Sequence, residues 1–247
     1  MTRKYPTADV KMLYGRAAAR CAFTDCRVDL VLNKTKNDKN KQIGEIAHIV
    51  AHSPAGPRAE SSYENIDSYD NWILLCPTHH KQVDTHRHTY PTTFLRELKI
   101  EHEKWVTECL DEEMSAVGFA ELEVAAKAVS NSKVVDKSDF IVIPPKEKMQ
   151  KNGLTDHSHH LIVMGLSRSS EVKEFIVKIA QIDSDFPERL KGEFKKKYLE
   201  LKENLHGDAL FEAMFEFAKG GNNDFKIQAA GLAILCHLFE ICEVFEK

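Results

Sequence analysis

Two stretches of the chain decide its fold: Gly44-Glu-Ile-Ala-His-Ile-Val-Ala-His-Ser-Pro-Ala-Gly-Pro-Arg58 and Asp70-Asn-Trp-Ile-Leu-Leu-Cys-Pro-Thr-His-His-Lys-Gln-Val-Asp84. Ile43–Ala51 predicts one strand and Trp72–Leu75 a second, shorter one, with a polar loop between them. Pro77 suits the first turn of a helix, where its missing amide hydrogen costs nothing. The order strand, loop, strand, helix predicts a small α+β region.

On either side of these stretches the sequence predicts helices. Apolar residues at helical spacing mark residues 5–20 and Pro91–Leu110. The pattern weakens from Ser130 to Thr155, which predicts a linker. Helices are expected again at about 169–182, 187–205, 208–219 and 223–245. The predicted organisation is a domain over residues 1–110, a connecting helix and linker over 111–168, and a helical bundle acting as an interaction module over 169–247.

The net charge of −4 conceals an asymmetry between the two ends of the chain. Residues 1–105 carry a net charge of +3, whereas residues 106–247 carry −7. A polyanion such as DNA is therefore expected to meet the front of the chain. No apolar run is long enough to cross a membrane and no secretory signal is evident, so a cytoplasmic protein is expected.

Four residues have the spacing of a zinc site. Cys21-x4-Cys26 and Cys76-Pro-Thr-His79 are two pairs, each able to present two donors from one tight turn. Structural zinc takes four nitrogen or sulfur ligands in a tetrahedron, and in a reducing compartment metal binding is favoured over a disulfide. The competing interpretation is two buried thiols. The fourth ligand is either His79 or His80, because adjacent helical residues point about 100° apart.

The two stretches quoted above resemble the HNH endonuclease family, in which a histidine ends one strand, an asparagine opens the next and a histidine lies on the following helix. The resemblance covers residues 20–105, and it is closest to HNH domains fused to sensor or interaction modules in bacterial anti-phage systems. It implies a zinc-stapled ββα-metal fold. It also implies that His48 is the general base, that Asn71 holds the loop orienting His48, and that His80 binds a catalytic Mg²⁺ or Mn²⁺. His79 then takes the zinc position.

The chain departs from the family pattern at Ala47, where many HNH enzymes have an aspartate that binds the metal. Glu45 would share the strand face of Ala47 and is the candidate replacement. Asp84 is a second possible ligand, although a cap or a surface ion pair is the favoured interpretation. Arg58 is interpreted either as a phosphate clamp or as an ordinary surface arginine.

The other histidines have no pattern of this kind. His52, His86 and His88 are expected to be loop or surface residues. The segment Asp156-His-Ser-His-His160 is expected to be a polar turn rather than a metal site, since no cysteine or carboxylate pair flanks it at ligand spacing.

The last predicted helix, Phe225–Phe245, is apolar nearly all round. Such a helix is buried in a bundle or against a partner. This one is expected to carry more apolar surface than a small four-helix domain can easily cover with itself. Its ending, Leu238-Phe-Glu-Ile-Cys-Glu-Val-Phe-Glu246, is similar to C-terminal modules of bacterial ABC three-component defence systems. That resemblance implies docking to a middle component and an ABC-type ATPase; self-association through residues 169–247 is the alternative.

The expected function is a metal-dependent HNH endonuclease that cleaves DNA, acting as an anti-phage effector under the control of partner proteins. One alternative is a zinc-stabilised nucleic-acid-binding protein without activity, with Ala47 marking a decayed site. Another is a stand-alone restriction endonuclease, which the acidic second half argues against.

Overall fold

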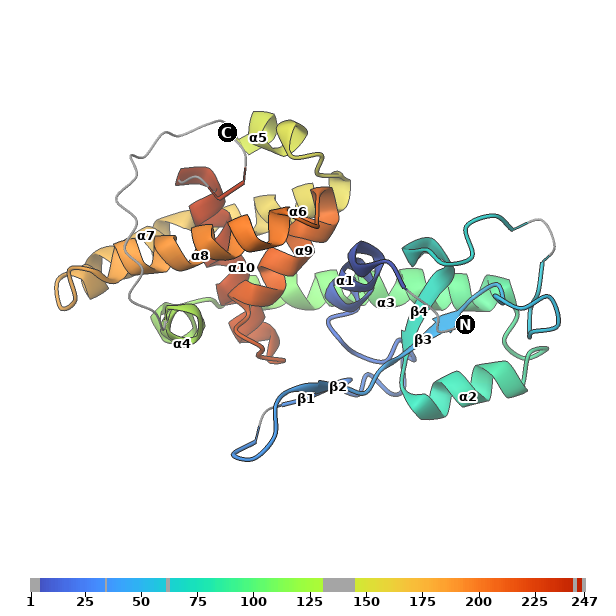
Figure 1. The fold of residues 1–247 in the computed structure, drawn as a ribbon. Coiled ribbons are helices and arrows are strands. Elements are labelled where there is room, and N and C mark those ends of the chain that lie inside the picture. The colour runs from blue at the N-terminus through green and yellow to red at the C-terminus, as the bar shows by residue number, and fades with distance from the viewer. Residues whose placement is uncertain (1–4, 34, 61–62, 131–144, 242–243, 246–247) are drawn as a thin grey trace. The chain divides into compact units, whose positions relative to one another are not determined.

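The computed structural model describes residues 5–33, 35–60, 63–130, 145–241 and 244–245 (Figure 1). The chain forms two compact units, Met1–Val106 and Thr107–Lys247. The boundary lies within one long helix, α3 (Thr92–Met114). Both small sheets lie in the first unit, and the second is helical among the residues described, so the predicted α+β class is confirmed.

The first unit is built around two antiparallel strands, β3 and β4. β3 (Glu45–His48) pairs with β4 (Trp72–Leu75), with Glu45 opposite Leu75 and His48 opposite Trp72. The remaining elements are α1 (Thr7–Arg16), the short pair β1 (Val31–Leu32) and β2 (Lys41–Gln42), the 3-10 turn η1 (Tyr69–Asn71), α2 (Pro77–Thr85) and the first part of α3.

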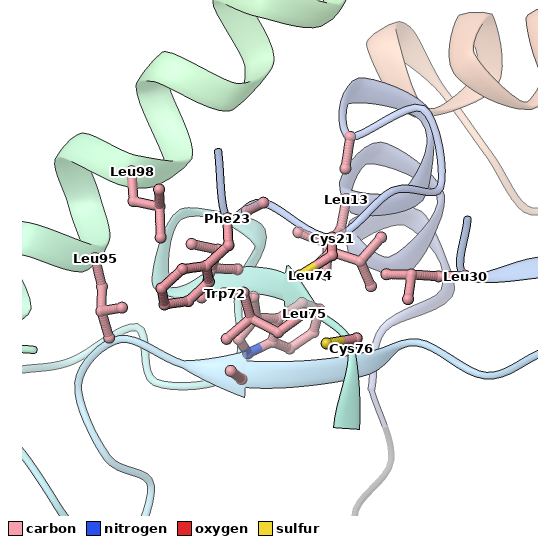
Figure 2. Packing of buried hydrophobic residues seen from close by; sticks show 14 of the residues in the cluster. Leu13, Cys21, Phe23, Leu30, Trp72, Leu74, Leu75, Cys76, Leu95 and Leu98 are labelled. Carbon is pink, nitrogen blue, oxygen red and sulfur yellow. The ribbon is translucent and has the colours of Figure 1, made fainter. Parts of the chain in front are cut away.

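β4 forms the centre of the core in this unit. All four of its residues are buried, as the unbroken apolar run Trp-Ile-Leu-Leu predicts. Figure 2 shows β4 side chains between Leu13 of α1 and the pair Leu95 and Leu98 of α3. α2 contacts both β3 and β4. The end of β3 and the start of α2 are thereby fixed to one buried strand.

The second unit is a helical bundle around α10 (Phe225–Ile241). Its other helices are α4 (Phe119–Val129), α5 (Pro145–Lys151), α6 (Asp156–Leu166), α7 (Ser169–Ala180), α8 (Phe186–Lys202) and α9 (Gly207–Ala218). α10 contacts α4, α6, α7 and α9. Every residue from 228 to 239 is buried. α10 and α6 pack closely at Gly165, where an added Cβ would lie 2.6 Å from the sulfur of Cys236.

Two expectations for the second unit are wrong. Residues 156–160 form the first turns of α6 and not a polar turn, because their histidines precede an apolar run that packs on α10. The last helix was also expected to carry more apolar surface than its own bundle could cover. It is covered, because α4 and α6, which the sequence did not reveal as core helices, pack on it.

The predicted linker only partly falls within the described residues. Residues 131–144 lie outside them, and α5 follows directly. None of the described helices has the length and hydropathy of a membrane span.

Candidate active site and metal centre

Four side chains of the first unit form a compact cluster of metal-binding groups. The sulfur atoms of Cys21, Cys26 and Cys76 and a ring nitrogen of His79 all lie within 4.8 Å of one another. Among the residues that the structure describes, no other group of three or more histidine, cysteine or acidic side chains has this arrangement. The cluster contains His79 and not His80.

Local structure accounts for the placement of each of these donors. Cys21 and Cys26 lie in the turns after α1, where the Cys26 amide donates to the Phe23 carbonyl. Cys76 is the N-cap of α2, and its sulfur accepts the amide hydrogen of His79. Helix α2 thus begins inside the cluster, with His79 in its first turn.

The cluster has the chemistry of a structural zinc site. Nδ1 of His79 lies 3.4 Å from the Cys21 sulfur and 3.3 Å from the Cys76 sulfur. The Phe23 ring stacks on the His79 ring, with centroids 4.0 Å apart. Burial raises the pKa of the Cys21 thiol to about 12, so its thiolate needs a cation beside it. Three sulfurs and one nitrogen are a ligand set that zinc takes in closed tetrahedral sites, and this cluster could hold it.

His48 lies at the end of β3. Its side chain is 7% exposed, and its Nε2 lies 2.8 Å from Oδ1 of Asp67. The indole nitrogen of Trp72, which lies opposite His48 in the sheet, is 3.2 Å from Nε2 of His48. The rings of Tyr5 and His52 pack around the imidazole. The ring is therefore held from several sides.

Asn71 connects the two loops around His48. Its side-chain amide donates to the carbonyls of Val50 and Ile66, and its Oδ1 accepts the amide of Val50, each at 2.9 Å. Its backbone carbonyl accepts the amide of Ile49. These are the contacts that a residue holding the loop after His48 would make.

A second polar group forms where β3 meets α2. Nδ1 of His80 lies 2.5 Å from Oε2 of Glu45, and its Nε2 lies 3.5 Å from Oδ2 of Asp84. The hydrogen bond to Asp84, followed by that to Glu45, raises the pKa of His80 despite its partial burial. Burial alone would raise the pKa of Asp84, but His80 and Arg58 lower it. The structure thus brings Glu45 to His80, whereas the Ala47 methyl is buried.

Arg58 connects the backbone around His48 with the His80 group. Its side chain is 4% exposed, and it donates to the carbonyls of His48, Ile49 and Val83 and to the Asp84 carboxylate. Nη2 alone contacts both the His48 carbonyl, at 3.2 Å, and Asp84, at 2.8 Å. The structure gives Arg58 a structural role that neither interpretation of the sequence anticipated, since its donors point into the protein.

Arg87, an exposed cation, lies in the segment directly after α2. A hollow of about 700 Å³ is lined by Ala55, Pro57 and residues 84–89, among them Asp84, His86, Arg87 and His88. A second hollow shares Arg87 and His88 and adds Arg58 and Glu60. Arg87 and His88 thus line both hollows, and Asp84, a partner of His80, lines the first.

Sequence reasoning missed Asp67 and Arg87. Neither lies in a motif with a fixed spacing, and both are on loops whose path depends on tertiary contacts. The only sequence signal for Asp67 is its place shortly before Asn71, in a loop that must return to β4.

Comparison with known proteins agrees with this geometry. Residues 21–89 match the family model of an HNH endonuclease. The match runs from the first cysteine of the cluster to just beyond α2, and so includes the cysteine cluster, His48, Asn71 and the His80 group. It supports an HNH nuclease region followed by a helical remainder. No curated protein matches the chain.

Proposed function

We propose that the first unit is a metal-dependent HNH endonuclease that hydrolyses DNA phosphodiester bonds. The observation that carries the proposal is the double contact of Arg58 Nη2 with the His48 carbonyl and the Asp84 carboxylate. Through this one nitrogen, the backbone of His48 at the end of β3 is joined to Asp84, which is a partner of His80. A protein that only bound nucleic acid would have no need for a base held beside acidic side chains, which repel phosphate.

In the proposed reaction, His48 removes a proton from a water molecule. The water oxygen forms a bond to phosphorus, the bond from phosphorus to the leaving sugar oxygen breaks, and that oxygen takes a proton from solvent. Histidine suits this step because its unperturbed pKa of about 6.5 lets it accept a proton near neutral pH. Asn71 holds the loop on which the geometry of His48 depends.

Two kinds of metal ion belong to the proposal. Zinc held by Cys21, Cys26, Cys76 and His79 would staple the fold. Mg²⁺ or Mn²⁺, held by His80 with Glu45 as the replacement for the missing aspartate, would stabilise negative charge on the phosphate. Oxygen and imidazole donors are of the type that these cations accept.

DNA is the proposed substrate because the first unit is net positive while the second is net negative. We assign the phosphate contacts to Arg87, with His86 and His88 beside it, since these line the hollows next to the His80 group. Arg58 then acts indirectly, by holding His48 and Asp84 in place.

The wider role, an anti-phage effector regulated by partners, is proposed from the sequence resemblances alone. It includes docking to an ABC-type ATPase or a middle component, or self-association through residues 169–247. The apolar surface of α10 does not support these contacts, because α10 is covered by its own bundle.

The test is plasmid cleavage by the purified full-length protein with Mg²⁺ or Mn²⁺. His48→Ala should lower the cleavage rate by about 10²–10⁴-fold, the usual contribution of a general base. It should leave DNA binding largely unchanged and the protein folded. His160→Ala, an exposed histidine of the second unit, is the matched control and should cleave normally.

Two outcomes would contradict the proposal. A folded His48→Ala protein that cleaves at the wild-type rate would remove His48 from the mechanism. A wild-type protein that binds DNA and cleaves nothing with either cation would favour the zinc-stabilised binding protein.

A further inference from the structure

The backbone around Asp67 is held by hydrogen bonds on both sides, although the side chain of Asp67 is 40% exposed. The carbonyl of the preceding residue, Ile66, is held by the Asn71 side chain. On the other side, the amide of Tyr69 donates to Asp9 of α1 at 2.7 Å. Two anchors from different elements therefore fix the backbone on either side of Asp67 and direct its carboxylate to His48.

The same nitrogen of His48 faces two partners with opposite demands. The indole nitrogen of Trp72 can only donate a hydrogen bond, so it is satisfied only when Nε2 carries no proton. The carboxylate of Asp67 is an acceptor, so it is satisfied only when Nε2 is protonated. The carboxylate is closer, at 2.8 Å against 3.2 Å, and a hydrogen bond to an ion is about twice as strong as a neutral one. The proton is therefore favoured on Nε2.

We infer that Asp67 is the positioning residue of His48: it holds the imidazole in the tautomer with hydrogen on Nε2 and makes Nδ1 the proton acceptor. This inference rests on the proposed function of His48 as base. When Nδ1 takes the proton of the attacking water, the imidazolium that forms lies beside a negative charge. Asp67 therefore stabilises the charged product of the proton transfer and does not itself exchange the proton.

His52, Tyr5 and Arg58 lie near His48 and act in other ways. Nε2 of His52 lies 3.4 Å from the second oxygen of Asp67, so it shares the carboxylate. Tyr5 meets the ring through its aromatic face, and Arg58 binds the backbone carbonyl. Neither supplies a negative charge to the imidazole.

The first experiment needs no activity. Nitrogen-15 NMR of the full-length protein should show His48 with hydrogen on Nε2 above its titration midpoint. In Asp67→Asn the midpoint should move to lower pH by about one unit, because an opposite charge beside the ring is lost. Asp70→Asn, the same change at an exposed site three residues away, should leave the midpoint in place. A His48 with hydrogen on Nδ1, or an unmoved midpoint in Asp67→Asn, would overturn the inference.

The second experiment is the pH profile of plasmid cleavage. Asp67→Asn should reduce kcat by about 10–100-fold, as loss of an orienting partner does elsewhere. Its acidic limb should move to lower pH, because a base with a lower pKa stays deprotonated in more acidic solution. Asp67→Glu should recover part of the rate. If Asp67→Asn instead only raises the Mg²⁺ concentration needed for half-maximal rate, Asp67 serves the cation and the inference is wrong.

The two experiments separate the failures. A wild-type protein that cleaves nothing, but whose His48 shows the expected tautomer and midpoint shift, would refute the nuclease proposal while the pairing of Asp67 with His48 stands. A nuclease that depends on His48 but shows no shift would refute only the role of Asp67.

Discussion

The two units of the chain hold their shapes by different means. The first has strands of two to four residues and relies on directional contacts: Arg58 donates to four partners, and Asn71 joins two loops. The second has a helix that is buried on all sides over twelve consecutive residues. Short strands bury little apolar area, so a small unit of this kind needs a metal or dense polar contacts, whereas a bundle is stabilised by burial itself.

Polar groups are buried in the second unit too, but they join helices that already pack. Asp208 of α9 accepts hydrogen bonds from the backbone and side chain of Thr155 and from Ser158. Lys148 of α5 is buried and donates to the carbonyl of Phe239. The difference teaches where function can reside: polar groups in the first unit surround an accessible site, whereas those in the second close a core.

Removing a zinc ligand should break the first unit and spare the second. We expect Cys26→Ser to unfold residues 5–106 in the full-length chain, because structural zinc contributes about 10–16 kcal/mol in small metal-dependent folds and domains are stable by only about 5–15 kcal/mol. Hydrogen exchange measured by mass spectrometry should show fast exchange in β3, β4 and α2 but protection in α10.

The matched control is Cys109→Ser, a half-buried thiol outside the cluster. It should retain one zinc ion per chain by elemental analysis. Two results would show that the cluster does not stabilise the first unit through zinc. One is wild-type protein purified without zinc, and the other is a Cys26→Ser protein whose β4 amides remain protected from exchange.

Mild acid should weaken the second unit through one buried histidine. Burial, with a smaller effect from Lys173, lowers the pKa of His237 to about 4. The folded state therefore resists a proton that the unfolded chain accepts from about pH 6.5. Stability from this group is complete above pH 6.5 and is lost as pH falls towards 4, by about 3 kcal/mol.

The measurement is denaturant dependence of hydrogen exchange in α10 between pH 7 and 4. His237→Gln should flatten the pH dependence, whereas His160→Gln should not. An equal slope in wild type and His237→Gln would show that the acid sensitivity of this unit lies elsewhere.

The smallest effect is expected from the exposed cation beside the active site. Arg87→Ala should weaken DNA binding by about tenfold or less and reduce the slope of log affinity against log salt concentration by about 1, as loss of one phosphate contact does. Lys196→Ala, an exposed cation of the second unit, should change neither quantity. Fluorescence anisotropy at several salt concentrations is the measurement, and an unchanged slope in Arg87→Ala would move the DNA path elsewhere.

The sequence predicted those features that depend on local pattern. The spacing of Cys21, Cys26 and Cys76 predicts the cluster, with His79 chosen over His80 by the family resemblance, and the run Trp72–Leu75 predicts its buried strand. The helices at 169–180, 186–202 and 207–218 lie close to their predicted bounds, because each has an apolar face or a glycine break.

Features that depend on contacts distant in sequence could not be predicted in this way. Arg58 lies on a loop, and only the folded chain shows that its guanidinium points inward to Val83 and Asp84. The same is true of Asp67, whose meeting with His48 depends on anchors in η1 and α1. Helix α6 was missed because three histidines in its first turns resemble a loop until α10 is seen beside it.

One consequence follows from two neighbouring residues of α2. His79 belongs to the cysteine cluster, whereas His80 contacts Glu45. The two side chains are consecutive, so they point about 100° apart around the helix axis and join two different groups. The rotation of α2 about its own axis therefore sets the direction of both side chains. The cysteine cluster fixes that rotation. A reagent that removes a metal ion from the thiols, or oxidises them, is expected to free this rotation and to turn His80 away from Glu45. Loss of the proposed cleavage activity in a chelator can therefore arise from removal of the proposed zinc, and adding back Mg²⁺ alone would not restore it.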